Sequence, residues 1–197
     1  PADSPLQSVA ELKGKTVALN KGSNVHYLLV KALEDAGLQY SDVNVSFLPP
    51  ADARAAFEKG AVDAWVIWEP FLAAAEAATG ARQLADGTGL VNNHEFYLAT
   101  RDLVDRDPEV VSVILESIGE VDDWVNANKN AVAAEFAPSL GIPVPILEVA
   151  ADRRTYGINP ITPEVVAQQQ AIADVFYELG LIPKAIRISD AIAEPQS

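Results

Sequence analysis

The stretch KTVALNKGSNVHYLLVKALEDAGL, Lys15–Leu38, predicts a strand, a turn and a helix in succession. The strand is the apolar run Thr16–Leu19, whose residue types suit a buried position in a sheet. In the turn, Gly22 is free to adopt a positive φ angle, and Ser23 or Asn24 can cap the following helix. The helix carries an apolar residue every three or four positions and ends at a glycine.

This turn is a candidate anion site. A Gly-Ser turn at the carboxyl end of a parallel strand directs several backbone N–H groups of the next helix toward one point. The positive end of the helix dipole lies at the same point and attracts negative charge. The alternative interpretation is an ordinary strand–helix turn with a good cap, and the stretch alone does not separate the two.

The composition restricts the partners of the chain. It has 28 acidic and 14 basic residues, a formal net charge of −14, so it repels nucleic acid and anionic membranes. No apolar run approaches the roughly 18 residues that a membrane helix needs, so we expect no direct membrane insertion. There is no cysteine, which excludes disulfides and thiolate metal sites. The chain starts at Pro1 and has no methionine, so we expect a processed product or a fragment.

Residues 1–14 predict a linker with one helical turn, in which Ser8 caps the segment Val9–Leu12. From 15 to 100, strands and helices alternate, as in an open, mostly parallel α/β sheet. Besides the first strand and helix, the pattern predicts strands at 41–47, 61–68, 82–85 and 95–100 and helices at 52–59 and 70–79.

The second half has helical patterns and almost no strands. The predicted helices lie at 108–128, 129–140, 143–153 and 163–179, and part of the tail 181–197 is expected to be disordered. An apolar helix face needs a surface to cover, and no second sheet is predicted for it. We therefore expect a missing partner segment, with apolar faces exposed on the helices 108–128 and 163–179.

A second candidate stretch is AWVIWEPF, Ala64–Phe71. Trp68 falls at the carboxyl end of the predicted strand, where α/β sheets place ligands, and could form an apolar wall there or belong to the core. Trp65 fits the core better. Glu69 directly precedes Pro70 and could accept a hydrogen bond from a cationic ligand group, but a capping role in the following helix is favoured.

The remaining candidates are single residues with weaker patterns. His26 could donate to a bound anion or be solvated, and Arg153 and Arg154 could form a paired anion clamp or belong to the solvated surface. A metal site of His26, His94 and Glu69 lacks any ligand-spacing signature, so we expect neither metal nor cofactor. No nucleophile with a base and an orienting group is visible, and we expect no enzymatic activity.

Four segments together resemble the periplasmic aliphatic sulfonate-binding proteins of ABC importers. They are LKGKTVALNKGSNVHYLLVKALEDAGL, PPADARAAFEKGAVDAWVIWEPF, HEFYLATRDLV and QQQAIADVFYELGLIPKAIRI, and ADARAAF followed by VDAWVIWEP is the most specific part. The broader group includes nitrate-, taurine- and thiamine-precursor-binding proteins and has the two-domain type II periplasmic binding fold. The resemblance implies a periplasmic receptor that closes over its ligand and docks on a membrane permease.

The resemblance also implies roles for three segments. The turn KGSNVH is similar to the segment that holds the ligand's sulfonate, WEP to part of the cleft wall, and HEFYLA to the strand returning from the second lobe. Family members begin with a further strand-rich segment that is not in this chain. The implied fold class is therefore α/β, with residues 15–100 as a complete, open, mixed-sheet second lobe and 101–197 as the helical part of the first lobe, without its sheet.

These observations predict a non-catalytic receptor that captures an organosulfonate anion between two lobes. The expected ligand-binding residues are Gly22, Ser23, Asn24, His26, Trp68, Glu69, His94 and Arg154. The alternatives are the effector-binding domain of a transcription regulator and an enzyme on the same fold, such as one of thiamine-pyrimidine synthesis. Neutral backbone donors do not titrate, so binding should be nearly constant between about pH 5 and 8 unless a protonated His26 contributes, which would weaken binding as pH rises.

Overall fold

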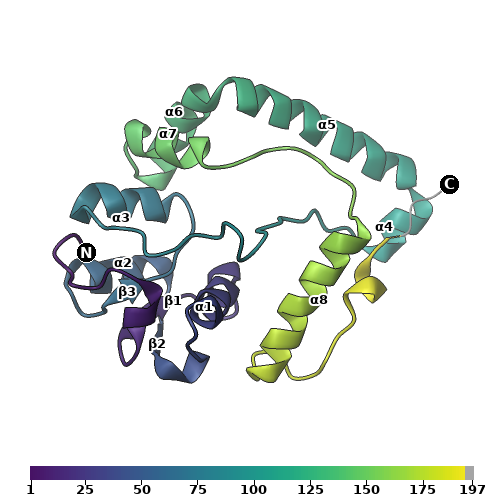
Figure 1. The fold of residues 1–197 in the computed structure, drawn as a ribbon. Coiled ribbons are helices and arrows are strands. Elements are labelled where there is room, and N and C mark those ends of the chain that lie inside the picture. Colours follow the sequence, from purple (N-terminus) through teal and green to yellow (C-terminus); the bar gives the residue numbers. More distant parts are fainter. Residues whose placement is uncertain (194–197) are drawn as a thin grey trace.

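The computed structural model describes residues 1–193 (Figure 1). Of the tail expected to be partly disordered, residues 181–193 are described and include the 3₁₀ helix η3 (Ile188–Ala191). Residues 194–197 lie outside the described residues.

The sheet has three parallel strands in the order β2-β1-β3. They are β1 (Thr16–Leu19), β2 (Asn44–Phe47) and β3 (Ala64–Trp65). Val17 of β1 pairs with Val45 on one side and with Ala64 on the other. Because β1 is the central strand, it is apolar on both faces, and its residues 17–19 have no exposed surface.

Two layers of helix cover the sheet. Val17 and Leu19 pack with Leu29 and Leu33 of α1 (Asn24–Asp35), together with Leu12 of η1 (Val9–Leu12). The intervening Ala18 points to the other face, where the other members of the core are Ala53 and Phe57 of α2 (Pro50–Glu58) and Val62. The alternation of side chains along a strand thus assigns one helix to each face. The 3₁₀ helix η2 (Tyr40–Asp42) precedes β2, and α3 (Phe71–Thr79) packs beside α2.

Two predicted strands are wrong, and the strands predicted at 41–47 and 61–68 are shorter than predicted. Residues 61–68 contribute only β3, and neither 82–85 nor 95–100 forms a strand in the structure. A strand pattern needs a neighbouring strand to supply its backbone hydrogen bonds, and within residues 1–193 none lies beside these segments. Leu98 accordingly is 93% exposed. For the same reason the sheet is parallel throughout the described residues and not mixed as expected.

The predicted helices of the second half are present, with ends within about two residues of the prediction. They are α5 (Pro108–Ala127), α6 (Lys129–Leu140), α7 (Val144–Asp152) and α8 (Pro163–Glu178), preceded by the unpredicted short helix α4 (Arg101–Arg106). Helices α6 and α7 form a small core of Ala133, Ile142 and Leu147. Figure 1 shows α5 crossing the top of the molecule, while α7 packs on α3 and α8 returns beside α1.

The exposed apolar face predicted for α5 is confirmed. No residue of this helix is buried, and its large exposed side chains are Val110, Val113, Ile114, Val121 and Trp124. Most of these lie three or four positions apart, so they form one stripe. The prediction holds only in part for α8, where Ala173 is buried, Phe176 is half-buried and Tyr177 is exposed.

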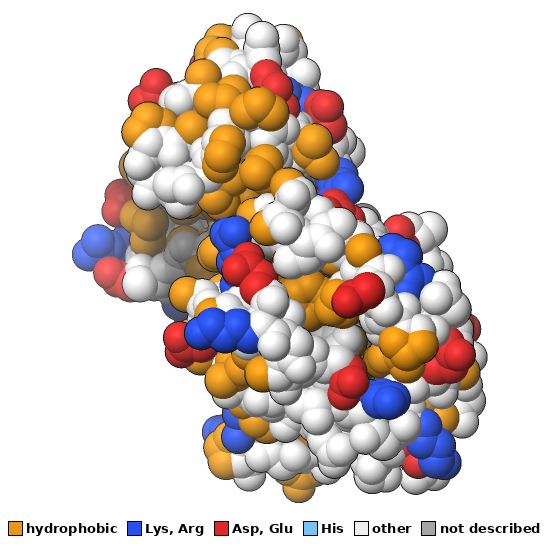
Figure 2. Space-filling model, turned by 90° about the vertical axis from the view of Figure 1, so that its left-hand side faces the viewer, with side chains coloured by type: hydrophobic (Ala, Val, Ile, Leu, Met, Phe, Trp, Pro, Cys, Tyr) orange, Lys and Arg blue, Asp and Glu red, His pale blue; other side chains and the backbone are white. Residues whose placement is uncertain are grey.

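Exposed apolar side chains also occur on α6, which the sequence did not single out. Phe136 is 53% exposed and Leu140 is 49% exposed. Figure 2 shows hydrophobic side chains gathered on the upper part of the molecule, which α6 and α7 form. No helix among residues 1–193 is both long enough and apolar enough to cross a membrane.

Candidate functional site

A cavity of about 690 Å³ lies where the start of α1, the segment after β3, and the residues after α7 approach one another. Of the eight residues predicted from the sequence, it is lined by Ser23, Asn24, Trp68, Glu69, His94 and Arg154. Gly22 and His26 are not among its lining residues. The structure therefore brings six of the eight candidates to one space, although they are far apart in sequence.

The turn before α1 presents free backbone donors to this cavity. Gly22 has a φ angle of 69°, a left-handed conformation that glycine adopts without strain. The Ser23 hydroxyl donates to the carbonyl oxygen of Asn20 at 2.7 Å, so it is engaged within the turn. The N–H groups of Ser23, Asn24 and Val25 have no hydrogen-bond partner within residues 1–193, and all three residues line the cavity. The first N–H groups of a helix are unpaired by geometry and suit an anion.

Polar side chains connect this turn to the loop that carries His94. The Asn24 amide Nδ2 donates to Asn93 Oδ1 at 2.8 Å. His94 Nε2 lies 3.0 Å from Gln168 Oε1 on α8, and the His94 ring stands edge-on to Phe96. His94 therefore lies between the turn and α8 and is exposed to the cavity.

Trp68 combines the two roles left open by the sequence. It is half-buried against the core under α1 and also lines the cavity. Trp65 also borders the cavity, but it packs beside Phe57 in the core, with ring centroids 6.1 Å apart. Its indole Nε1 is buried and has no partner within the described part of the chain.

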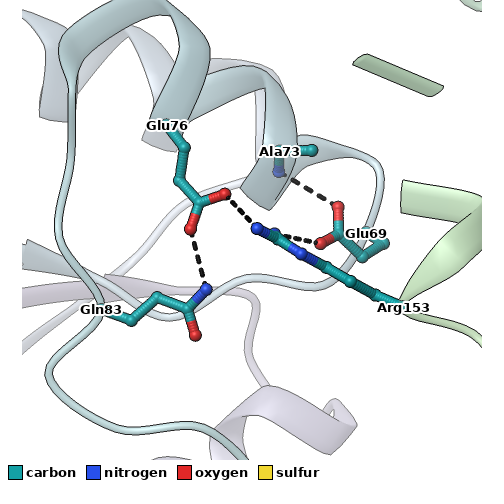
Figure 3. A network of polar contacts seen from close by, with 5 residues as sticks. All are labelled: Glu69, Ala73, Glu76, Gln83 and Arg153. Carbon is teal, nitrogen blue, oxygen red and sulfur yellow. Dashed lines mark hydrogen bonds and ion pairs between the residues drawn. The ribbon is translucent and has the colours of Figure 1, made fainter. Parts of the chain in front are cut away.

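Glu69 is part of a polar network that Figure 3 shows from close by. Its Oε2 accepts from the Ala73 N–H at 3.1 Å, so the carboxylate caps a free N–H of the first turn of α3, although Glu69 itself precedes the N-cap residue Pro70. Its Oε1 pairs with Arg153 Nη1 at 2.8 Å, and Arg153 Nη2 pairs with Glu76 Oε2 at 2.7 Å. Gln83 Nε2 donates to Glu76 Oε1 at 2.8 Å. One guanidinium thus joins two carboxylates, and these hydrogen bonds raise the pKa of Arg153.

The two adjacent arginines differ in their surroundings. Arg153 is held by Glu69 and Glu76, whereas Arg154 pairs with Glu95, whose side chain is 72% exposed. The Arg154 guanidinium also lies over the ring of Tyr156, 5.8 Å from its centroid. Since an exposed partner is readily exchanged, Arg154 is the cation of this pair that remains available to an anion in the cavity.

His26 occupies neither of the two positions expected for it. It is fully buried, at 0% exposure, and forms hydrogen bonds with Gly22 and Tyr40. Sequence reasoning considered Arg153 only as part of an anion clamp with Arg154 and missed its pairing with Glu69 and Glu76. No spacing signal was available for this pairing, because Glu69 precedes α3 and only Glu76 lies in the helix. Residues 1–193 contain no cluster of His, Asp or Glu that could hold a metal ion.

Comparison with known proteins identifies relatives of this chain. The chain is 41% identical over 194 residues to an Escherichia coli (strain K12) protein described as an aliphatic sulfonates-binding protein, covering 98% of this chain and 61% of the relative. It is 31% identical over 192 residues to a Bacillus subtilis (strain 168) protein of the same description, covering 96% of this chain and 58% of that relative. The chain thus spans about three fifths of the curated relatives it matches.

Two solved structures are similar to the whole described fold. The periplasmic aliphatic sulphonate binding protein SsuA from Escherichia coli superposes with a TM-score of 0.93 at 41% identity, covering 98% of this chain and 63% of that chain. The alkanesulfonate-binding protein SsuA from Xanthomonas axonopodis pv. citri, bound to MOPS, gives 0.88 at 34% identity, with coverages of 98% and 67%. The fold class is therefore that of the periplasmic binding proteins, as expected. The NMT1-like family matches residues 2–140, and the chain belongs to this family.

Proposed function

We propose that the full-length protein is the solute-binding receptor of an ABC importer and that it captures an organosulfonate without chemical turnover. The single observation that carries this proposal is the set of free N–H groups at Ser23, Asn24 and Val25, three residues that line a cavity with an aromatic wall. The similarity to sulfonate-binding proteins supports the choice of a sulfonate among anions.

An acidic chain can hold an anion only through local donors. The formal net charge of −14 repels any anion at long range, so the site must rely on dipoles and on nearby cations. Lys21 lies over the Phe47 ring, 5.4 Å from its centroid, and is not among the residues that line the cavity. The N–H groups of the α1 turn would therefore hold the sulfonate oxygens, with Arg154 as the cation within reach.

The rest of the cavity suits the organic part of such a ligand. Leu28 of α1, Trp68 after β3 and Leu72 of α3 line it beside the polar turn. An alkyl group placed there leaves water, which is favourable in proportion to the apolar area that it buries. A charged head at the turn and a chain along these side chains together define an alkanesulfonate.

We place this ligand between two lobes. Residues 15–100 would form one lobe, residues 101–197 the helical part of the other, and residues 1–14 the hinge side. The network from Arg153 to Glu69 and Glu76, which joins the ends of α7 and α3, would lie at this junction. Closure of the lobes over the anion would then form the surface that docks on a membrane permease, in the periplasm.

Calorimetric titration of the full-length protein tests the proposal. We expect butanesulfonate to bind at micromolar or lower Kd, and butanol and butylammonium, which match its chain but lack the anion, to bind at least about a hundredfold more weakly. Mass spectrometry of the ligand after incubation should recover it unchanged. No measurable sulfonate binding would contradict the receptor role. A chemically altered ligand would instead favour an enzyme, and sulfonate-dependent DNA binding a transcription regulator.

Replacing Trp68 with alanine should weaken butanesulfonate binding by about 1–2 kcal/mol, because a half-buried aromatic wall is lost from the cavity. The matched control is Trp124→Ala on α5, which removes the same side chain outside the cavity and should leave the affinity unchanged. The affinities come from calorimetry and the stabilities from urea denaturation. Unchanged affinity together with a loss of stability in Trp68→Ala would assign Trp68 to the core alone.

A further inference from the structure

His26 is the one fully buried polar residue of the described chain, and both of its ring nitrogens are engaged. Nδ1 accepts the Gly22 N–H at 3.1 Å, and Nε2 lies 2.7 Å from the Tyr40 hydroxyl oxygen. Since a nitrogen that accepts from a backbone N–H carries no proton, the proton of the neutral ring is on Nε2 and is donated to Tyr40. The ring is thus fixed in one tautomer, with its acceptor directed at the turn before α1.

The surroundings of the ring are apolar on several sides. The rings of Tyr40, Phe47 and Phe176 lie 5.4, 5.4 and 5.9 Å from it, centroid to centroid. They come from η2, the end of β2, and α8. The titratable groups that face it are the Tyr40 phenol and the Lys21 ammonium, and within residues 1–193 no carboxylate is hydrogen-bonded to it. Burial, and then the charge of Lys21, lower the pKa of His26.

The hydrogen bond that the Gly22 N–H donates to His26 Nδ1 is well placed to control the shape of the turn. Gly22 has no side chain to anchor it, and nothing lies within 4 Å of the position that its Cβ would take. The turn is held instead by two hydrogen bonds, one from Gly22 N–H to His26 and the other from the Ser23 hydroxyl to Asn20. The free N–H groups of Ser23, Asn24 and Val25 follow directly, so their direction depends on these bonds.

We propose that His26 is a positioning residue for the anion site: its unprotonated Nδ1 holds the turn in the shape that presents these N–H groups, and protonation of the ring releases the anion in acid. The proposal rests on the proposed function. A proton on Nδ1 would face the Gly22 N–H, so two donors would oppose each other and the bond would be lost. In this proposal the anion affinity falls as the pH falls. A protonated histidine that contacts the anion directly would have the opposite effect, since binding would then weaken as the pH rises.

The expected pH range follows from the direction of the pKa. Because the pKa of folded His26 lies below the ordinary value of about 6.5, the neutral ring predominates above about pH 6.5, and affinity should change little between there and pH 8. Affinity should fall as the pH drops toward the lowered pKa. The stability that the neutral ring contributes follows the same direction: it is fully present above about pH 6.5 and is lost as the pH falls through the folded pKa.

The test is calorimetric titration of the full-length protein with butanesulfonate at about pH 8, 6.5 and 5, on the wild type and three variants. We expect the wild type to bind about tenfold more weakly at the lowest pH than at the highest. His26→Asn puts an amide oxygen near the position of Nδ1 and does not titrate, so it should bind within about threefold of wild type at pH 8 and lose the pH dependence. His26→Gln reaches toward Tyr40 and leaves the Gly22 N–H unpaired, so it should bind roughly tenfold more weakly at every pH.

His94→Gln removes the other histidine and should keep the wild-type ratio between pH 8 and 5, which excludes His94 as the titrating group. Nitrogen NMR of the imidazole provides the spectroscopic check, with Nδ1 unprotonated at pH 8. Wild-type affinity that is equal at pH 5 and 8 overturns the proposal, and so does an unaltered pH dependence in His26→Asn. Failure of butanesulfonate to bind at pH 8 would instead refute the proposed function, and the two failures are thereby distinguished.

Discussion

Replacing Val121 with aspartate should lower the free energy of unfolding of the full-length protein by about 3 kcal/mol or more. Val121 lies on the exposed apolar stripe of α5, where it is 57% exposed in the described residues. The chain spans 61% of the aliphatic sulfonates-binding relative, and we propose that the corresponding remainder of the full-length protein covers this stripe. A carboxylate placed beneath such a cover loses the burial of valine and has no partner for its charge.

Ser112→Asp is the matched control for this prediction. Position 112 is nine residues from position 121, which puts it on the opposite side of the same helix, and Ser112 is exposed. The same new charge at this position should change the stability by less than about 0.5 kcal/mol. Urea denaturation of both variants gives the comparison. Equal, small effects at the two positions would mean that the stripe of α5 is solvent-exposed in the full-length protein as well.

Arg153→Met should lower the free energy of unfolding by about 2–3 kcal/mol. The variant keeps the length of the side chain but leaves the carboxylates of Glu69 and Glu76 without their shared cation. Their side chains are only 12% and 22% exposed, so the loss is large for an ion pair. The expected loss of stability is smaller than that for breaking a fully buried ion pair, because Arg153 itself is 37% exposed and partly screened by water.

Arg54→Met on α2 is the comparison for this pair. Arg54 is also 37% exposed, but it pairs with the single carboxylate of Glu58 one turn away, which is 36% exposed. Its loss should cost about 0.3–0.5 kcal/mol, as for other exposed pairs within a helix. Equal stability of the two methionine variants in chemical denaturation would mean that the network in Figure 3 contributes no more to stability than an exposed ion pair within one helix.

The sequence predicted the local elements well because their signals are local. The apolar run Thr16–Leu19, the glycine turn after it and the helix to Asp35 all depend on residues within one short stretch. The stripe on α5 was predicted for the same reason, since periodicity reveals an apolar face whether or not it is covered. The strands expected at 82–85 and 95–100 failed because a strand depends on a partner that no local pattern contains.

The candidate site was predicted in part. The residues whose roles were predicted wrongly depend, like the two wrong strands, on contacts between distant parts of the chain. The position of Trp68 at the end of a strand, and of Ser23 at the start of a helix, follows from chain order in an α/β fold. The burial of His26 does not follow from chain order. It depends on Tyr40 and on Phe176, which is 150 positions further along the chain. The pairing of Arg153 with Glu69 likewise joins residues 84 positions apart.

The most direct measurement of where the anion binds is the change in backbone amide resonances when butanesulfonate is added to the isotope-labelled full-length protein. Hydrogen bonds from N–H groups to a charged acceptor are strong and alter the resonances of the donors themselves. We predict that the largest changes occur at the amides of Ser23, Asn24 and Val25, followed by the indole N–H of Trp68. Saturable binding whose changes leave these three amides unaffected would contradict an anion site at the start of α1.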